Sequence, residues 1–244
     1  MILKNKNIFV TGVGKGIGLD LLHEIIKEGG FVYGVTRSKL DIKNIKHKNA
    51  KIYYGDVRNV KLIKKIFNDS LKDRRIITGI VNNAAERQRS SFEKINLFKL
   101  EKLFKINFFS IFSIMKIFYK YISNKNVKSS IVNLGSIVGK LGFEHLSGYA
   151  STKTALVGLT KSFAVEMADR NIRANIVNPG FIETSYFKNF KKKKKLYSWT
   201  LSRIPMKRWG ESNEISKLIC FLLSQNSSYI NGQEINIDGG WTSY

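Results

Sequence analysis

The stretch NIFVTGVGKGIGLDLLHEIIKEGG at residues 7–30 contains an apolar run, a glycine-rich turn and an amphipathic segment in direct succession. The run at 7–11 is rich in β-branched and aromatic residues, which favours a strand, and the segment from 17 onward has the apolar spacing of a helix. A turn nearly free of side chains lets backbone N–H groups and a helix N-terminus approach a phosphate. The spacing does not match G-x-G-x-x-G, because position 17 is Ile. Glycine-rich turns also occur in ordinary strand-to-helix connections, but this order favours a phosphate site.

Further short runs of β-branched and aromatic residues recur along the chain, with helix-length segments between them. They lie at 31–36, 51–54, 76–82, 130–135, 172–178 and 233–237. Such alternation predicts parallel strands joined by helical crossovers, with helices on both faces of the sheet. The 244 residues contain no internal repeat or Pro/Gly-rich linker and fit one domain. We therefore expect a single-domain, Rossmann-like, doubly wound α/β fold of about seven strands over residues 1–244.

The charge of the chain makes polyanions possible partners. There are 42 Lys+Arg against 18 Asp+Glu, which gives a formal net charge of +24. A charge of this size attracts nucleic acid and acidic proteins. The lysines are scattered through nearly every segment, however, which favours a compositional trend over one designed groove. We therefore do not expect specific nucleic-acid binding.

Other features favour a cytoplasmic protein without a membrane anchor. The single cysteine, Cys220, excludes an intramolecular disulfide and favours a packed thiol in a reducing compartment. The N-terminus reaches the glycine-rich turn before any long apolar run, so no signal peptide is expected. The apolar segment 106–119 is interrupted by Asn107 and Lys116 and is too short to span a bilayer.

Two segments suggest contacts beyond the sheet. The segment 97–122 is apolar almost all round its helical circumference, which indicates either a subunit contact or an unusually thick core. The stretch at about 183–203, which contains the run Lys191 to Lys195, follows a strand end and is expected to form a substrate lid.

The end of the second strand bears on the choice of cofactor. An acidic residue about twenty positions after the glycine-rich turn would bind a ribose 2′-hydroxyl, but the chain has Val35-Thr36-Arg37-Ser38 there. Arg37 can instead form charged hydrogen bonds to a 2′-phosphate, and Lys15 can join it. This pairing favours NADP(H) over NAD(H), although NAD(H) remains possible because in so basic a chain both residues can be solvated charges.

A serine, a tyrosine and a lysine form the candidate catalytic set. Tyr149 and Lys153 are four residues apart and so share one helical face. Tyr121 and Lys125 repeat that spacing by chance, but only the first pair follows a serine at a predicted strand end, Ser136. The carboxyl edge of the sheet, where Ser136 lies, is where α/β proteins bind ligands.

The chemistry of this set is acid–base catalysis on an oxygen atom. A free tyrosine has a pKa of about 10 and is a poor base at neutral pH. An adjacent ammonium and a positive nicotinamide ring favour the phenolate, so that Tyr149 can act as both acid and base. Ser136 can donate a hydrogen bond to a substrate oxygen that gains charge. The set therefore predicts hydride transfer to or from a carbonyl carbon.

Taken together, the motifs resemble those of the short-chain dehydrogenase/reductase family over essentially the whole chain. They are TGVGKGIG at 11–18, Asp56-Val57, NNAA at 82–85, Asn107, Ser136, YASTK at 149–153, Pro179-Gly180 and INIDGGW at 235–241. Ala85 stands where many members have Gly. The resemblance implies a homotetramer or dimer that pairs the helices around 97–122 and 148–168.

The resemblance also implies roles for individual residues. Ser136, Tyr149, Lys153 and Asn107 would be catalytic, with Asn107 holding a water that links Lys153 to solvent. The adenine would contact Asp56 and Val57, and the carboxamide Ile182 and Thr184. The full cofactor-binding set would be Gly12, Gly14, Lys15, Gly16, Ile17, Gly18, Arg37, Asp56, Val57, Asn82, Asn83, Ala84, Tyr149, Lys153, Pro179, Gly180, Ile182 and Thr184.

Within the family two subgroups look similar to this chain. The stretches GSIVGKLG and NPGFIET look like 3-oxoacyl-[acyl-carrier-protein] reductases of fatty acid biosynthesis, whereas GVTRS and LSRIPM look like NADPH-dependent dicarbonyl and sugar reductases. The basic surface favours the first, because acyl carrier proteins are acidic. Lys128 and Arg170 lie near positions where such reductases carry carrier-binding arginines, while Arg87 and Arg89 can instead meet a sugar acid or a phosphate.

The alternative outside the class of enzymes is a binding protein that keeps the nucleotide-binding fold and uses its charge to bind nucleic acid. The complete catalytic set argues against it. No metal site is expected, because His23, His47 and His145 lack metal-ligand spacing. His145 lies in the loop between Ser136 and Tyr149, where we expect it to be solvated.

Overall fold

The seven expected strands form one parallel sheet in the computed structural model, which describes residues 1–184 and 187–243. Their order across the sheet is β3-β2-β1-β4-β5-β6-β9. The strands are β1 (Asn7–Thr11), β2 (Phe31–Thr36), β3 (Ala50–Tyr54), β4 (Ile77–Asn82), β5 (Ser129–Leu134), β6 (Ile172–Pro179) and β9 (Glu234–Ile237). The order reverses between β1 and β4, and ligands of doubly wound sheets bind at such a reversal.

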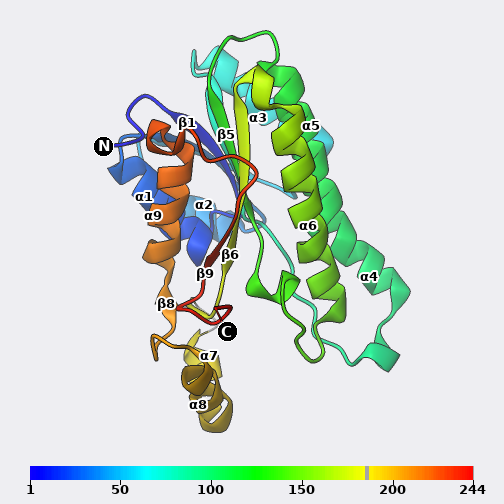
Figure 1. Ribbon diagram of the computed structural model, residues 1–244. Helices are drawn as coiled ribbons and strands as arrows, with labels where there is room; N and C mark the ends of the chain where they lie inside the picture. Colours follow the sequence, from blue (N-terminus) through cyan, green and yellow to red (C-terminus); the bar gives the residue numbers. More distant parts are fainter. Residues whose placement is uncertain (185–186, 244) are drawn as a thin grey trace.

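Helices cover both faces of this sheet (Figure 1). One face carries α1 (Ile17–Lys27) and α9 (Ser212–Leu223), and the other carries α3 (Val60–Lys72), α5 (Ser110–Ile122) and α6 (Ser147–Glu166). The remaining helices are the shorter α2 (Lys39–Asn44), α4 (Leu97–Phe104), α7 (Phe187–Lys191) and α8 (Lys194–Arg203). The fold is thus the doubly wound single-domain α/β fold that the sequence predicts.

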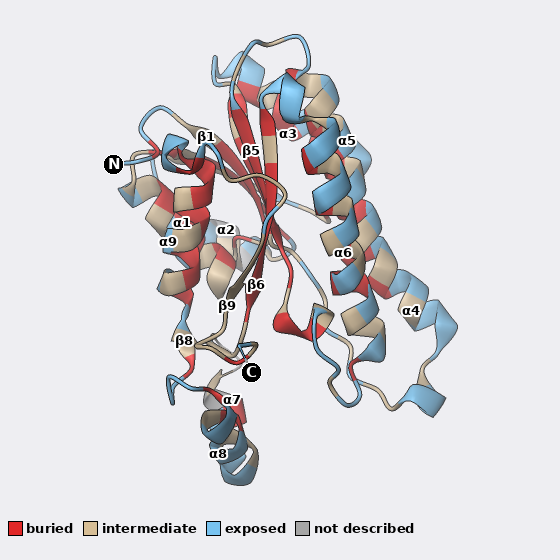
Figure 2. Ribbon diagram, viewed as in Figure 1, coloured by how far each residue is buried: buried red, intermediate tan, exposed pale blue. Residues whose placement is uncertain are grey.

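Burial follows from this layering. The central strands are buried along nearly their whole length, and all six residues of β5 are buried, as a sheet covered on both faces requires (Figure 2). One apolar cluster lies under α3, α5 and α6, and a second lies under α1 and α9. Cys220 belongs to the second cluster, and the expectation of a packed thiol is confirmed.

A third, smaller cluster lies beyond the carboxyl ends of the strands. It joins Phe190 of α7 to Trp209 and Trp241, with Phe181 and Phe143 packed against it. Two short strands, β7 (Ile182–Glu183) and β8 (Gly210–Glu211), pair beside it. The helices α7 and α8 occupy most of the expected lid at 183–203, of which residues 185–186 lie outside the described residues. The expected lid segment therefore packs on an aromatic layer. Figure 1 shows its helices α7 and α8 beyond the carboxyl ends of the strands.

The apolar segment 97–122 is helical but not one regular helix. The helices α4 and α5 are joined by a π-helical turn, Lys105–Phe109, which contains the buried Asn107. Large apolar side chains on the outer surface remain uncovered, with Leu97 at 73% and Phe98 at 74% exposure. Among the described residues, no helix is long and apolar enough to cross a membrane.

The aromatic centre of the first cluster yields a stability prediction. The Phe67 ring is fully buried and packs on the rings of Phe9, Phe118 and Tyr121, with centroids 5.5, 6.1 and 4.9 Å away. We expect Phe67→Ala to lower the free energy of unfolding by about 3–5 kcal/mol, measured by urea denaturation. Phe92→Ala is the control, because Phe92 is 81% exposed and should change stability by less than about 0.5 kcal/mol. Equal losses in the two variants would contradict this account of the core.

Candidate active site

The glycine-rich turn after β1 is shaped by contacts that leave no room for side chains. Gly12 has a φ of +74°, a conformation that favours glycine. A Cβ on Gly14 would lie 1.8 Å from Oδ2 of Asp41, and one on Gly18 would lie 2.0 Å from the carbonyl oxygen of Gly12. The turn therefore presents bare backbone at the start of α1, which fits a bound phosphate.

Hydrogen bonds fasten this turn to the end of β4. The Thr11 hydroxyl accepts hydrogen bonds from the backbone N–H groups of Asn83 (3.0 Å) and Ala84 (2.9 Å). The Asn83 side-chain amide donates back to the carbonyls of Thr11 (2.9 Å) and Gly12 (3.1 Å). The two strand ends at which the sheet order reverses are thus held in a fixed relation.

A cavity of about 470 Å³ lies at this reversal. It extends from the glycine-rich turn across the ends of β2 and β3. The expected cofactor residues that line it are Gly12, Gly14, Lys15, Arg37, Asp56, Val57, Asn83 and Ala84. The bare backbone of the turn, which carries Lys15, and the guanidinium of Arg37 after β2 fit the phosphates of a dinucleotide that carries a 2′-phosphate.

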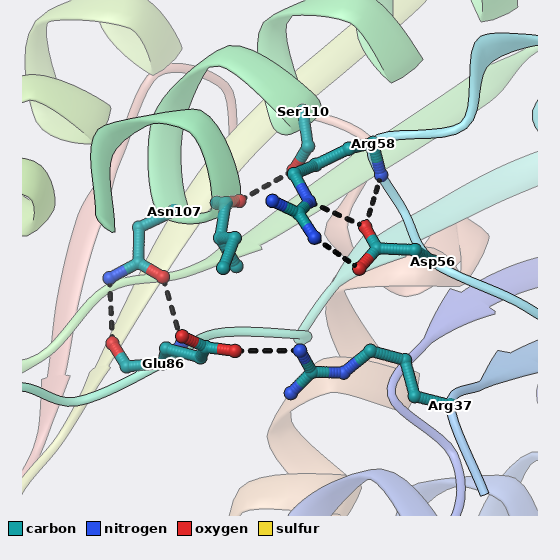
Figure 3. Close-up of polar contacts among 7 residues, drawn as sticks. Arg37, Asp56, Arg58, Glu86, Asn107 and Ser110 are labelled. Carbon is teal, nitrogen blue, oxygen red and sulfur yellow. Dashed lines mark hydrogen bonds and ion pairs between the residues drawn. The ribbon is translucent and has the colours of Figure 1, made fainter. Parts of the chain in front are cut away.

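Carboxylates neutralise the arginines at this end of the site (Figure 3). Arg37 Nη1 lies 2.6 Å from Oε1 of Glu86, so this pair joins the segments that follow β2 and β4. Arg58 holds both carboxylate oxygens of Asp56 at 2.9 Å, and this contact is the main reason that the pKa of Asp56 is lowered. A 2′-phosphate must therefore compete with Glu86 for Arg37.

Asn107 fixes the backbone of the segment that follows β4, at Glu86 (Figure 3). Its Oδ1 accepts from the Glu86 N–H at 2.9 Å, and its Nδ2 donates to the Glu86 carbonyl at 2.8 Å and to the Thr152 hydroxyl at 3.1 Å. The π-helical turn brings this buried amide to that position. Asn107 therefore connects the segment after β4 to the helix that carries Lys153.

A second cavity, of about 620 Å³, adjoins the first and shares Asn83 and Ala85 with it. Ser136, Tyr149 and Lys153 all line it, from the end of β5 and the first turns of α6. The structure thus brings together the three residues that the sequence spacing predicts to act as a set. Ile17, Pro179, Gly180, Ile182 and Thr184 line the same cavity, next to this set.

Hydrogen bonds position the serine and the lysine. The Ser136 N–H donates to Oδ1 of Asn178 at 3.0 Å, and the Ser136 hydroxyl accepts from the N–H of Val138 at 3.2 Å. Lys153 Nζ donates to the Leu134 carbonyl at 2.6 Å and lies 5.7 Å from the centroid of the Tyr149 ring. The ammonium of Lys153 is therefore held between the end of β5 and the phenol.

Burial sets the protonation of these groups. It lowers the pKa of Lys153 to about 8, so that the ammonium still predominates at neutral pH. Burial raises the pKa of Tyr149, while the charge of Arg87 and a hydrogen bond with Ser136 act in the opposite direction. At neutral pH the phenol is therefore protonated and ready to donate.

Four of the expected site residues do not line these two cavities. Gly16 caps α1, Gly18 is buried in its first turn, and the Asn107 amide bonds to the backbone of Glu86. Asn82 was expected to line the cofactor groove, but its side chain is buried and donates to Oδ1 of Asn133 at 2.7 Å. The last residue of β4 points into the core because side chains alternate along a strand.

Two basic residues that we expected near an acidic carrier lie away from the site. Lys128 precedes β5 and Arg170 precedes β6, so within one chain both are at the opposite end of the sheet from Ser136. Lys128 lines a separate cavity there, and Arg170 contacts Asp169. His145 Nε2 lies 3.1 Å from Oε1 of Glu144, and His145 is not among the lining residues of the second cavity.

Sequence reasoning missed Glu86 and most of the aromatic wall of the second cavity, which includes Phe143, Phe181 and Trp209. Glu86 directly follows NNAA, and its position opposite Arg37 depends on the folded chain. The aromatic residues come from three distant segments without a common spacing. The only available signal was that Phe143 and Phe181 follow strand ends, while Trp209 follows α8. Within the described part of the chain, no group of three or more His, Cys, Asp or Glu could hold a metal.

Known proteins of nearly the same length are similar to this chain. A family model described as enoyl-(acyl carrier protein) reductase matches residues 12–242. A 3-oxoacyl-[acyl-carrier-protein] reductase, FabG, of Buchnera aphidicola is 32% identical over 98% of both chains. The 2-dehydro-3-deoxy-D-gluconate 5-dehydrogenase of Bacillus subtilis is 30% identical over 99% of this chain and 96% of the relative. A putative 2-deoxy-d-gluconate 3-dehydrogenase from Agrobacterium tumefaciens, solved with bound NADP, superposes with a TM-score of 0.90 at 27% identity, over 99% and 98% of the two chains.

The Arg37–Glu86 pair yields a prediction about the choice of nucleotide. We expect Glu86→Gln to raise the ratio of kcat/KM for NADPH to that for NADH, because Arg37 loses a competing carboxylate. Both side chains are partly exposed, so the gain should be at most about fivefold. Arg37→Asp should lower the ratio by tenfold or more, since it places a negative charge where we expect the 2′-phosphate to bind.

Glu93→Gln is the matched control, because Glu93 is an exposed carboxylate that pairs with Ser91 outside the cavity. It should leave the ratio unchanged. Equal use of NADPH and NADH by the unmutated protein would show that Arg37 is only a solvated charge.

Proposed function

The chain belongs to the short-chain dehydrogenase/reductase family, and from this membership we propose that it reduces the 3-oxo group of acyl chains bound to an acyl carrier protein, with NADPH. As a member of the family, it is an oxidoreductase. The observation that carries the finer assignment is the apolar wall of the catalytic cavity. The wall contains Ile137, Val138, Phe143, Phe181 and Trp209 beside Ser136 and Tyr149. An acyl chain buries its methylene groups favourably against such a wall.

Each residue of the set has a proposed part in the reduction. Bound NADPH supplies the hydride to the carbonyl carbon. Ser136 donates a hydrogen bond to the carbonyl oxygen as negative charge develops there. Tyr149 gives its phenolic proton to that oxygen, and the ammonium of Lys153 stabilises the phenolate that remains. We further propose that Asn107 holds a water through which Lys153 exchanges protons with solvent.

Two further proposals concern partners. Leu97, Phe98, Phe109 and Phe112 leave apolar surface exposed along α4 and α5, which a second copy of the chain would cover in a dimer or homotetramer. Arg37, Arg58 and Arg208 form ion pairs with carboxylates, and Arg173 donates a hydrogen bond to a backbone carbonyl. These four cations are thus engaged within the chain, which supports our proposal that the positive charge does not form a nucleic-acid groove.

A sugar-acid dehydrogenase is the second candidate. Arg87 and Arg89 line the catalytic cavity and suit the carboxylate of such a substrate. The 30% identical relative from Bacillus subtilis, named as a dehydrogenase of a dehydrodeoxygluconate, supports it. Rates of NADPH consumption with acetoacetyl thioesters, diacetyl and sugar ketones separate the two assignments.

The first prediction of this proposal concerns Tyr149. We expect Tyr149→Phe to lower kcat by a hundredfold or more and to leave the Kd for NADPH within about twofold, because acid–base groups contribute about 10² to 10⁴. The control is Tyr121→Phe, whose hydroxyl bonds to Ser70 and to the N–H of Ile77 at 3.0 Å, far from the set. That variant should lose about 1 kcal/mol of stability and keep its turnover. Near-normal turnover of Tyr149→Phe would remove this residue from the mechanism.

The second prediction concerns the carrier. The net positive charge of the chain should speed its encounter with an acidic carrier protein. The acetoacetyl group should therefore be reduced with a far higher kcat/KM when it is attached to the acyl carrier protein than when it is attached to N-acetylcysteamine. This advantage should shrink as the screening length falls from about 30 Å at 0.01 M salt to about 8 Å at 0.15 M. Equal kcat/KM for the two substrates at low salt, or a strong preference for a sugar ketone, would show that the acyl-carrier assignment is wrong.

A further inference from the structure

Arg87 and Arg89 lie where the catalytic cavity opens into a second apolar space. That space, of about 620 Å³, has walls of Phe143, Phe181, Trp199 and Trp241, and we call it the aromatic chamber. Arg87 and Arg89 line both the catalytic cavity and the aromatic chamber. The segment after β4 that carries them has no regular secondary structure, and both residues border the same two spaces.

These two side chains lack the partners that other arginines of the chain have. Within the described residues, Arg74, Arg87 and Arg89 are the arginines whose side chains make no hydrogen bond, ion pair or ring contact. Arg74 lies in the turn before β4, at the opposite edge of the sheet. Only Arg87 and Arg89 therefore combine the absence of a partner with a position at a cavity.

The charge around the junction is not balanced by acidic groups. Among the residues that the structure describes, no Asp or Glu lines the catalytic cavity. Glu144, at the rim of the aromatic chamber, has a side chain that is 82% exposed and lies 3.1 Å from His145. Arg87 is also close enough to Tyr149 for its charge to act on the phenol. Two guanidinium groups that line the same spaces repel each other, and an anion bound between them offsets this repulsion. Their planar forks match the oxygens of a carboxylate or a phosphate.

We propose that the substrate carries an anionic group, a carboxylate or a phosphate, which Arg87 and Arg89 bind while the ketone lies at Ser136 and Tyr149. This inference rests on the proposed function for the position of the ketone. Binding of the anionic group at the arginines fixes one end of the substrate. The carbonyl group then has a single orientation toward Ser136 and Tyr149. Any apolar part beyond the anion enters the aromatic chamber. The carboxylate of a keto acid and the phosphate of a phosphopantetheine arm are the two sources of this chemistry.

Binding can be followed without turnover. All three tryptophans of the chain, Trp199, Trp209 and Trp241, line the two spaces, so intrinsic fluorescence reports their occupancy. In the presence of NADP⁺ no ketone is reduced, and a titration gives Kd directly. Two matched pairs serve as probes: levulinate with methyl levulinate, and acetoacetyl-phosphopantetheine with acetoacetyl-pantetheine. The first pair tests a carboxylate and the second a phosphate.

We expect the anionic member of one pair to bind about tenfold to a hundredfold more tightly than its neutral partner. The double variant Arg87→Gln with Arg89→Gln should reduce this ratio to about one. The control Arg74→Gln removes an unpaired arginine at the opposite edge and should leave the ratio unchanged. The pair with the larger arginine-dependent ratio identifies the source of the anion.

The proposal is wrong if neither anionic probe binds better than its neutral partner, or if the preference survives in the double variant. Failure of the proposed function has a different result. In that case neither acetoacetyl substrate supports NADPH consumption, while the arginine-dependent preference in Kd persists.

Discussion

The hydrogen bonds between Thr11 and the segment Asn83-Ala84 hold together the two strand ends on which the site depends. In a doubly wound sheet the crossovers leave β1 and β4 in opposite directions, and a crevice opens between their carboxyl ends. The backbone hydrogen bonds between β1 and β4 end there. Beyond that point, hydrogen bonds of the Thr11 and Asn83 side chains connect the two strand ends. The glycine-rich turn, the arginines after β2 and β4 and the catalytic cavity are all placed relative to this junction.

Most of the fold was predictable because local sequence decides it. All seven strands follow from short β-branched runs and lie within one or two residues of their expected bounds. Tyr149, Lys153 and Ser136 were also predictable, since helical spacing and a strand end suffice to bring them to one edge. The residues that sequence analysis misplaced or missed depend on pairing between distant segments.

Asn82 and Glu86 illustrate that limit. One register position decides whether the side chain of Asn82 points to the groove or to Asn133, and the sequence of β4 alone does not fix it. Glu86 meets Arg37 only because β2 and β4 flank β1 on opposite sides. Lys128 and Arg170 are a different case. Both lie just before a strand whereas Ser136 lies just after one, so the lengths of β5 and β6 set their distance from Ser136. The aromatic wall likewise gathers residues from the segments after β5, β6 and α8, which no periodicity relates.

The π-helical turn at Lys105–Phe109 has a consequence for how the helix can change in evolution. Such a turn corresponds to one residue added to an α-helix, in which each residue turns the chain by about 100°. Deleting one residue would restore a regular helix, but it would also withdraw Asn107 from the Glu86 backbone. The same deletion would rotate the helical face of Leu97 and Phe98 by about 100° relative to that of Phe109 and Phe112. One extra residue in the helix thus determines two features. It sets the position of Asn107 beside the catalytic set, and it sets how the exposed apolar side chains of α4 and α5 are oriented relative to each other. A deletion in this turn would change both features together.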